Sequence, residues 1–433
     1  MNELLTGGIM LLLLVLYLGL GMWIFMGLIL VSATALYFVA DFSLTRIGFS
    51  LQTIVWSSST RWELAALPMF IWMGELMYRT DISERLFRGL APLVSMLPGR
   101  LLHVNVLGCT LFAAISGSSS ATTATVGKIT IKNLKERGYS EKLAIGSLAG
   151  AGSLGLLIPP SVVLIIFGVV GEVSISKLFM AGVLPGLMTA AFYVIYVMIV
   201  SSTGKNAVPP APKYSWRDRI RGLYDISPIV ALVALIMGGL YSGVVSPSEA
   251  GAASVAVSLL YILLSGQFSI RLMRESLAST VNISSMLCAI IIAANFLSTA
   301  MGYLNVPASI ANGIASLELN PYVLILVLAL FFTLLGLFLE GVSITVMTLP
   351  ITLPLVVQAG FDPVWFGVFL VIAVEMATIT PPVGFNLFIL QGLTDKSLGY
   401  VARAAFPFFL IMLLSGVLIT IFPEIALWLT RSM

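Results

Sequence analysis

Long apolar stretches recur through this sequence from Leu4 to Leu429, and they constrain its fold more than any other feature. A helix needs about 20 apolar residues to cross the roughly 30 Å hydrocarbon core of a bilayer. Hydrophobic residues make up 59% of the 433 residues, charged residues make up only 9%, and the mean hydropathy is +1.06. A water-soluble core cannot hide that much apolar surface. We therefore expect an all-α, multi-pass membrane protein embedded in a lipid bilayer.

The N-terminal apolar segment runs from Leu4 to Ala40 and is interrupted only at Gly19-Leu20-Gly21. It carries neither the basic flank nor the small-residue cleavage site of a secretory signal peptide. We therefore expect two retained spans joined by a tight turn.

Lys and Arg are concentrated in a few loops, as they are in the cytoplasmic loops of membrane proteins. The basic loops are residues 79–100, 128–142 and 205–221 and the loop with Arg271 and Arg274. In contrast, residues 304–321 and 358–365 contain no Lys or Arg and should face outside. This distribution predicts a topology in the bacterial inner membrane. No nucleic-acid-binding motif accompanies the basic residues, so we expect no nucleic-acid partner.

A polar stretch at residues 201–224, rich in Pro, Lys and Arg, divides the chain nearly in half and is expected to be a cytoplasmic linker. Each half contains a Gly/Ser/Thr-rich break in an apolar run and, some 40 residues later, a Pro-Pro pair. The breaks are residues 116–123 and 340–345, and the pairs are Pro159-Pro160 and Pro381-Pro382. Because the pattern occurs twice at similar spacing, the sequence predicts an internal repeat.

The apolar run before the first break, Leu101 to Ile115, is 15 residues long. A helix of that length spans roughly 22 Å, which is short for a crossing and favours one arm of a re-entrant hairpin. Basic flanks place both ends of this hairpin in the cytoplasm, whereas the flanks of the second break lack Lys and Arg and should lie outside. Two equivalent hairpins that enter from opposite sides predict an inverted-topology repeat, in which secondary transporters hold substrate near the midplane.

The breaks are the expected binding sites. Non-helical backbone at membrane depth is tolerated only where it is buried in protein or lines a watery cavity. Freed carbonyls and hydroxyls suit a desolvated Na⁺, and helix N-termini suit an anion. Each Pro-Pro pair should unwind a span opposite a hairpin tip. The candidate substrate contacts are Ser118, Ser119, Ser120, Thr122, Ser161, Ser343 and Asn386.

Packing alone explains many Gly/Ser clusters in membranes, but two matched clusters, each followed by a Pro-Pro break, favour function. Acidic residues in or near apolar segments also suggest function, and Glu340 and Glu375 stand out among them. Glu340 is equally consistent with a structural hydrogen-bond acceptor or a proton site. Ser246 and Glu249 have the spacing of a helix start, which is a structural role.

These motifs resemble the large membrane subunit of tripartite ATP-independent periplasmic (TRAP) transporters, the DctM or M-subunit family, over essentially the whole chain. The segments that carry the resemblance are Gly117 to Thr122, Gly155 to Ser161, Ser246 to Ala250 and Thr380 to Asn386.

The resemblance implies an elevator mechanism, in which a transport domain with both hairpins slides past a fixed scaffold and carries substrate and Na⁺. It implies N-terminal scaffold helices at 1–100, two transport-domain halves at 101–200 and 321–433, the linker at 201–224, and C-terminal scaffold helices at 225–320. It implies two Na⁺ sites, one around Ser116, Gly117, Gly152, Gly155 and Pro159 and its mirror around Gly341, Thr345, Thr378 and Thr380. No organic cofactor is expected.

The resemblance also implies two protein partners. One is a small four-helix membrane subunit of the Q type, and the other is a soluble periplasmic binding protein that delivers C4-dicarboxylates, sialic acid or other carboxylates. A Na⁺-driven import subunit for a small organic anion is therefore the expected function.

Three alternatives stay open at this point. A self-sufficient Na⁺/dicarboxylate symporter shares hairpins and inverted repeats. A membrane-embedded enzyme needs a nucleophile–base pair or metal ligands, yet the chain has one His, no His-Glu-x-x-His and no Gly-x-Ser-x-Gly elbow, so no enzyme is expected. A passive scaffold or channel subunit would not need the two polar breaks.

Overall fold

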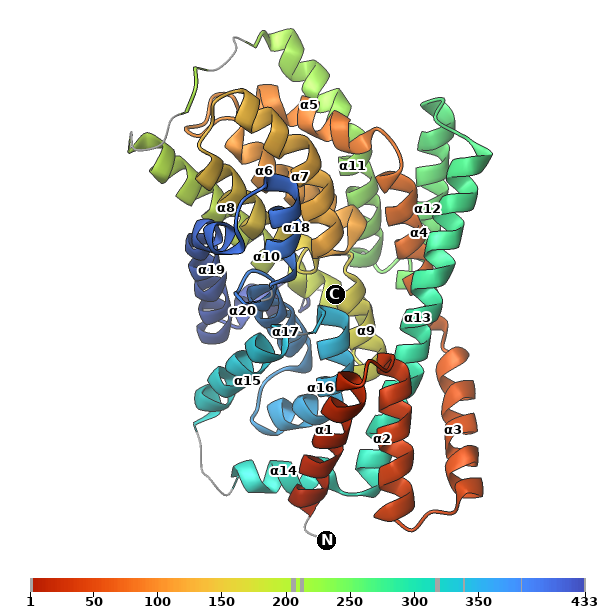
Figure 1. Ribbon diagram of the computed structural model, residues 1–433. Coiled ribbons are helices and arrows are strands. Elements are labelled where there is room, and N and C mark those ends of the chain that lie inside the picture. Colours follow the sequence, from red (N-terminus) through yellow and green to blue (C-terminus); the bar gives the residue numbers. More distant parts are fainter. Residues whose placement is uncertain are drawn as a thin grey trace.

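The computed structural model describes residues 3–203, 208–210, 214–315, 320–337, 339–382 and 384–431. Over these residues the chain is helical and has no strands (Figure 1). Residues 204–207 and 211–213 of the predicted linker lie outside the described residues.

The helices pack mainly within two groups, each drawn from both halves of the chain. The first group contains α1 (Glu3–Gly19), α2 (Ile24–Phe38), α3 (Leu44–Ser59), α4 (Ala66–Tyr78), α5 (Ile82–Val94), α11 (Trp216–Tyr241), α12 (Pro247–Leu264), α13 (Ile270–Tyr303) and α14 (Val306–Ala315). The pair α1–α2, joined by a short turn, confirms the two helices expected from the N-terminal segment.

The second group contains both breaks. Its first-half members are α6 (Leu102–Ser116), α7 (Ser119–Glu136), α8 (Glu141–Gly152), α9 (Val162–Gly171) and α10 (Ile175–Ser202). Its second-half members are α15 (Pro321–Leu335), α16 (Gly341–Gln358), α17 (Pro363–Thr378), α18 (Phe385–Thr394), α19 (Leu398–Ile421) and the short α20 (Glu424–Leu427).

The order of elements in this group repeats, as the sequence predicts. In each half a hairpin of two helices is followed by a helix, a Pro-Pro break, a second short helix and a long helix. Pro185 lies inside α10 and Pro407 inside α19, so the repeat continues into the long helices. Figure 1 shows the α6–α7 hairpin in the upper half of the molecule and the α15–α16 hairpin in the lower half.

Six of the described helices are long and apolar enough to cross a membrane: α10, α11, α12, α13, α16 and α19. The apolar helices beside the breaks are shorter, among them α6, α9, α15, α17 and α18. They are short because Gly, Ser and Pro interrupt them, and these interruptions place loop backbone inside the helix bundle.

Serine side chains fix several helix starts by accepting a backbone N–H that would otherwise be unpaired. At the start of α12, Ser246 Oγ accepts from Glu249 N at 3.4 Å, and the Glu249 carboxylate accepts from Ser246 N at 2.8 Å. This reciprocal pair confirms the helix start predicted from Ser246 and Glu249.

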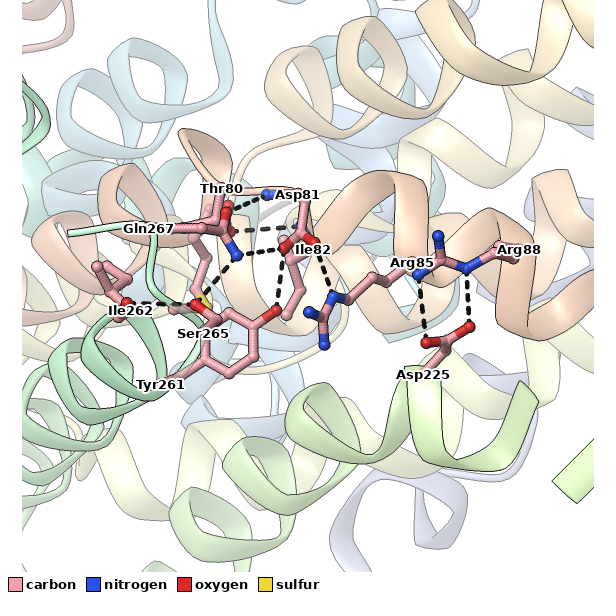
Figure 2. A network of polar contacts seen from close by, with 11 residues as sticks. Thr80, Asp81, Ile82, Arg85, Arg88, Asp225, Tyr261, Ile262, Ser265 and Gln267 are labelled. Atoms are coloured by element: carbon pink, nitrogen blue, oxygen red, sulfur yellow. Dashed lines mark hydrogen bonds and ion pairs between the residues drawn. The ribbon is translucent and has the colours of Figure 1, made fainter. Parts of the chain in front are cut away.

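A polar network fastens the corner between α4 and α5 to α12 and the loop that follows it (Figure 2). The Asp81 carboxylate accepts from Arg85 Nε at 2.7 Å, Gln267 Nε2 at 2.7 Å and Tyr261 OH at 3.1 Å. Burial raises the pKa of Asp81, but these hydrogen bonds outweigh it, so the pKa lies below its usual value. Beside this network, Arg88 pairs with Asp225 of α11 at 2.9 Å. These contacts anchor α5, which leads directly into the first hairpin.

Candidate functional site

The first hairpin turns within two residues. Gly117 adopts the left-handed conformation with φ +57°, which glycine tolerates best. Ser118 then caps α7 by accepting from Ala121 N at 3.4 Å. Below the turn, the Ser116 and Thr122 hydroxyls are 2.7 Å apart and hold the two arms together.

The first Pro-Pro break lies against this tip. Residues 156–161 leave the helix between α8 and α9, and Ser161 restarts it by capping α9 at Leu164 N. A Cβ on Gly155 would lie 2.5 Å from Ser119 Cα, and one on Gly117 would lie 3.0 Å from Pro160 O. Two stretches of backbone therefore meet here without room for a side chain, as expected for a break opposite a hairpin tip.

The second hairpin and second break are built differently. Glu340 stands at the start of α16 but supplies no side-chain cap, and its side chain is exposed. The break at residues 379–384 follows α17, and Gly384 has φ +30°. A Cβ on Gly341 would meet the side-chain atoms Val374 Cγ1 at 2.8 Å and Leu156 Cδ1 at 3.1 Å. The second tip therefore contacts apolar side chains rather than backbone.

A fully buried carboxylate, that of Glu375 on α17, joins the two halves at the first hairpin tip. Glu375 Oε1 accepts from Ser119 Oγ at the first hairpin tip and from Leu156 N in the first break at 3.1 Å. Thr378 Oγ1 lies 2.8 Å from the backbone O of Glu375 and 3.2 Å from Glu375 Oε2, either of which can accept its proton, and it accepts from Asn386 Nδ2 at 3.3 Å. We call Ser119, Leu156, Glu375, Thr378 and Asn386 the central cluster.

The central cluster and its surroundings offer oxygen atoms suited to a cation. Among the described residues no Lys, Arg or His side chain pairs with Glu375, so neutral hydrogen-bond donors alone surround its carboxyl group. Asn386 Oδ1 and Thr123 Oγ1 are buried and have no hydrogen-bond partner within the described part of the chain. Thr123 Oγ1 also packs directly against Gly152. These potential ligand atoms are all oxygens, which fits Na⁺.

The candidate residues from the sequence divide into two sets. The structure brings Ser116, Gly117, Ser118, Ser119, Thr122, Gly152, Gly155, Pro159, Ser161, Thr378 and Asn386 to the first tip, the first break and the central cluster. Thr345 and Thr380 instead donate to carbonyls of their own segments, Gly341 O at 2.8 Å and Met376 O at 2.6 Å. Ser120 on α7 and Ser343 on α16 make no hydrogen bond to a described residue through their hydroxyls, and Gly341 lies at the apolar contact of the second tip.

Sequence reasoning singled out Glu375 but assigned it no partner, and it did not assign a role to Thr123. The signal for Glu375 was a carboxylate inside an apolar run. For Thr123 no such signal exists, because a threonine one turn into a helix is common in packing contacts. Within the described residues, no three His, Cys, Asp or Glu side chains gather to hold a metal ion.

A buried polar cluster joins the first hairpin tip, the first break and the helices on either side of the second break inside a bundle of apolar helices. We therefore class the chain as a membrane transport protein. The family model of the DctM component of tripartite ATP-independent periplasmic transporters matches residues 9–425, so the chain belongs to the DctM family of TRAP transporter large permeases. The family resemblance, the inner-membrane location and the role in transmembrane transport predicted from the sequence are thereby confirmed, and the family is one of transporter subunits, not enzymes.

Relatives agree with this assignment. The C4-dicarboxylate TRAP transporter large permease DctM of Pseudomonas aeruginosa is 34% identical, over 88% of this chain and 90% of that protein. The isethionate TRAP transporter permease DctMQ of Oleidesulfovibrio alaskensis is 29% identical over 87% of this chain, which covers 59% of that longer protein. Among solved structures, the YdaH transporter of Alcanivorax borkumensis has a similar fold, with a TM-score of 0.61 and 14% identity over 90% of each chain.

Proposed function

We propose that this chain imports a small organic anion of the carboxylate class, coupled to Na⁺, by an elevator movement of the helix group that contains both hairpins. The observation that carries the proposal is the central cluster, in which Glu375 ties the first hairpin tip to both Pro-Pro breaks. An elevator has to move its binding site as one body, and hydrogen bonds between both halves of the site favour such a unit.

Na⁺ would supply positive charge next to the buried carboxylate and the unpaired oxygens. Thr378, Asn386 and Thr123 would hold it with backbone carbonyls of the breaks, near Glu375. The Ser118 to Thr122 hydroxyls and the N-terminal N–H groups of α7 and α9 would bind the substrate carboxylate, because helix N-termini favour anions. The α6–α7 and α15–α16 hairpins would be re-entrant from opposite faces.

The helix group α1–α5 and α11–α14 would serve as the fixed scaffold. A small membrane subunit of the Q type and a soluble periplasmic binding protein would complete the transporter. The description of the family as tripartite and the longer DctMQ relative support separate partners for this chain. Carboxylate as the substrate class is supported by the C4-dicarboxylate permease that is 34% identical.

Uptake into proteoliposomes tests the proposal. Vesicles with this chain and the small subunit are given an inward Na⁺ gradient and labelled succinate, malate or N-acetylneuraminate, with and without the matching binding protein. Uptake that requires both Na⁺ and the binding protein is the expected result. Na⁺-driven uptake without the binding protein would instead indicate a self-sufficient symporter, and uptake that is indifferent to Na⁺ would remove the coupling ion from the proposal.

A further inference from the structure

A second polar site lies away from the central cluster, between the two helix groups. It is a cleft with a volume of about 410 Å³. One wall comes from α3 and α13 of the first group, and the other comes from the end of α9 and from α16 of the second. Small-molecule sites commonly have volumes of about 300–1,000 Å³, so the cleft has the size for a small carboxylate.

A positively charged side chain lines this cleft. Among the described lining residues, only Arg61 is positively charged, and its side chain is 33% exposed. Its Nη2 pairs with Glu172 Oε1 at 2.8 Å, and its Nη1 donates to Val169 O at 2.9 Å. A guanidinium binds carboxylates through a planar fork of N–H donors, and here the Glu172 side chain already occupies one of its donors.

The Glu172 carboxylate is held loosely. Its side chain is 73% exposed, and an ion pair at such a position contributes little to stability. A carboxylate from solution can therefore replace it on Arg61 without burying an unpaired charge, because the released Glu172 side chain stays exposed.

The wall on the side of Arg61 is otherwise mainly polar and uncharged. Ser57, Ser298, Asn295 and Thr299 line it, and the Ser57 and Ser298 side chains are exposed. The Ser57 and Thr299 hydroxyls and the Asn295 amide already donate within the protein, so their oxygens can accept from a hydroxyl or amide of a small organic acid. The Ser298 hydroxyl can donate to a second carboxylate.

The cleft also lies on the side from which an imported solute arrives. The segment α8–α9 begins after the basic loop at 128–142, and α10 ends before the basic linker at 201–224, so both outer ends of this pair are cytoplasmic by charge. The loop at 172–174 joins α9 to α10 and therefore faces outside, together with Glu172.

We infer that Arg61 forms an entry site for the carboxylate of the solute, with Glu172 as a built-in competitor that a substrate displaces. This inference rests on the proposed function and adds a site that is separate from the central cluster. The alternative is a latch in which Arg61 only caps the C-terminal end of α9 and pairs the two helix groups. A latch explains the Val169 contact, but it does not require the neutral polar side chains that line the cleft beside Arg61.

Chemical modification distinguishes an entry site from a latch without relying on uptake. The purified complex of this chain and the small subunit is treated with phenylglyoxal, and modification of each arginine is followed by mass spectrometry. Arg46 is the internal control, since it lies on α3, the helix that precedes Arg61, but lines a different hollow. We expect succinate, pyruvate and N-acetylneuraminate to slow the modification of Arg61 but not of Arg46, and we expect succinamide, which has no charge, to have no effect. Unchanged modification of Arg61 with all three acids would overturn the inference.

Two variants distinguish an entry site from a latch. For an entry site, uptake should fall in one variant and not in the other, whereas for a latch uptake should change in the same direction in both. Uptake at a low, fixed concentration of loaded binding protein should fall about tenfold in Arg61→Gln, the effect of losing a charge-assisted hydrogen bond. Glu172→Gln removes the competitor and should match or exceed the wild type, with protection of Arg61 at lower succinate concentration. Arg46→Gln is the matched control and should behave as the wild type. If Arg61→Gln and Glu172→Gln change uptake in the same direction, the pair is a latch. A wild type without any uptake would refute the proposed function, whereas the protection experiment separately tests the site.

Discussion

The two halves of the second helix group repeat the same backbone plan but differ in the chemistry at the points where they meet. The first hairpin tip reaches the second half through Ser119, which donates to Glu375. The second tip reaches the first half through Gly341, which lies against Leu156 and Val163 side chains. One meeting point is thus polar and the other apolar.

The same asymmetry appears at equivalent positions. Ser153 and Glu375 each precede the first proline of their pair by six residues. Ser153 donates to Gly150 O, one turn back in its own segment, at 2.6 Å and otherwise interacts with Tyr193 of the same half, whereas Glu375 binds groups from both halves. The repeat therefore gives both halves the same backbone arrangement at this position. Only the side chain decides that the position in the second half, and not its equivalent in the first, forms hydrogen bonds between the halves.

The largest effect should come from removing the carboxylate that makes this difference. Glu375→Ala leaves the buried N–H of Leu156 and the Ser119 hydroxyl without their acceptor, and uptake should fall about a hundredfold. Glu375→Gln keeps an acceptor oxygen and should fall about tenfold. The measurement is initial uptake per correctly inserted protein in proteoliposomes.

Ser153→Ala is the matched control, because it changes the equivalent position in the first half. Its uptake should stay within about twofold of the wild type, since a hydroxyl bonded to its own helix contributes little. Equal losses in Ser153→Ala and Glu375→Ala would contradict the asymmetry.

A smaller effect is expected from the hairpin tips. Gly117→Ala places a side chain at φ +57° and 3.0 Å from Pro160 O, so the tip has to shift, and uptake should fall about tenfold. Gly341→Ala starts a regular helix and meets only side-chain ends, so its loss should be smaller. A larger loss of uptake in Gly341→Ala than in Gly117→Ala would contradict the proposed difference between the two hairpin tips.

Loss of single hydroxyls should change the response to Na⁺ more than the maximal rate. Ser119→Ala should raise the Na⁺ concentration for half-maximal uptake severalfold, without preventing membrane insertion, which a titration of uptake against NaCl would measure. Thr380→Ala loses only a bond to Met376 O of its own segment and should change this concentration less. The equivalent change in the second tip, Ser343→Ala, is the comparison variant. An unchanged Na⁺ dependence in Ser119→Ala would remove this side chain from the ion site.

The smallest effect on transport is expected outside both meeting points. Asp81→Asn weakens the network at the α4–α5 corner, and because the pair with Arg85 is partly exposed, stability should fall by at most about 1 kcal/mol. The pKa of Asp81 is lowered in the folded protein, so its contribution is present above the usual value of 3.8 and is lost as the pH falls through the lower folded pKa. Thermal unfolding against pH should show that loss below pH 3.8 in the wild type and not in Asp81→Asn. A large loss of uptake in this variant at neutral pH would place the corner in the transport step.

Several elements could be predicted because their signals are local. Gly117 and Ser118 indicate a turn and a helix cap, and Ser246 and Glu249 indicate a helix start. The Pro-Pro pairs indicate unwound backbone. The hydrogen-bond partners of Glu375 could not be predicted, because Ser119 and Leu156 lie 256 and 219 residues away along the chain. For the same reason, no sequence pattern could separate Thr378, whose hydroxyl lies beside Glu375 Oε2 and Asn386 Nδ2, from Thr345 and Thr380, whose hydroxyls donate to backbone carbonyls of their own segments.

By itself, the sequence determined that the chain is a multi-pass helical membrane protein with an internal repeat and two breaks, since apolar length, Lys/Arg distribution and Gly/Ser/Pro interruptions act through local chemistry. Only the tertiary structure decided which tip meets which break, that Glu375 joins them, and that Arg61 lies in a cleft between α3, α9, α13 and α16. Those contacts depend on how helices from distant parts of the chain pack. Packing is set by shape and burial over the whole bundle, which no local pattern records.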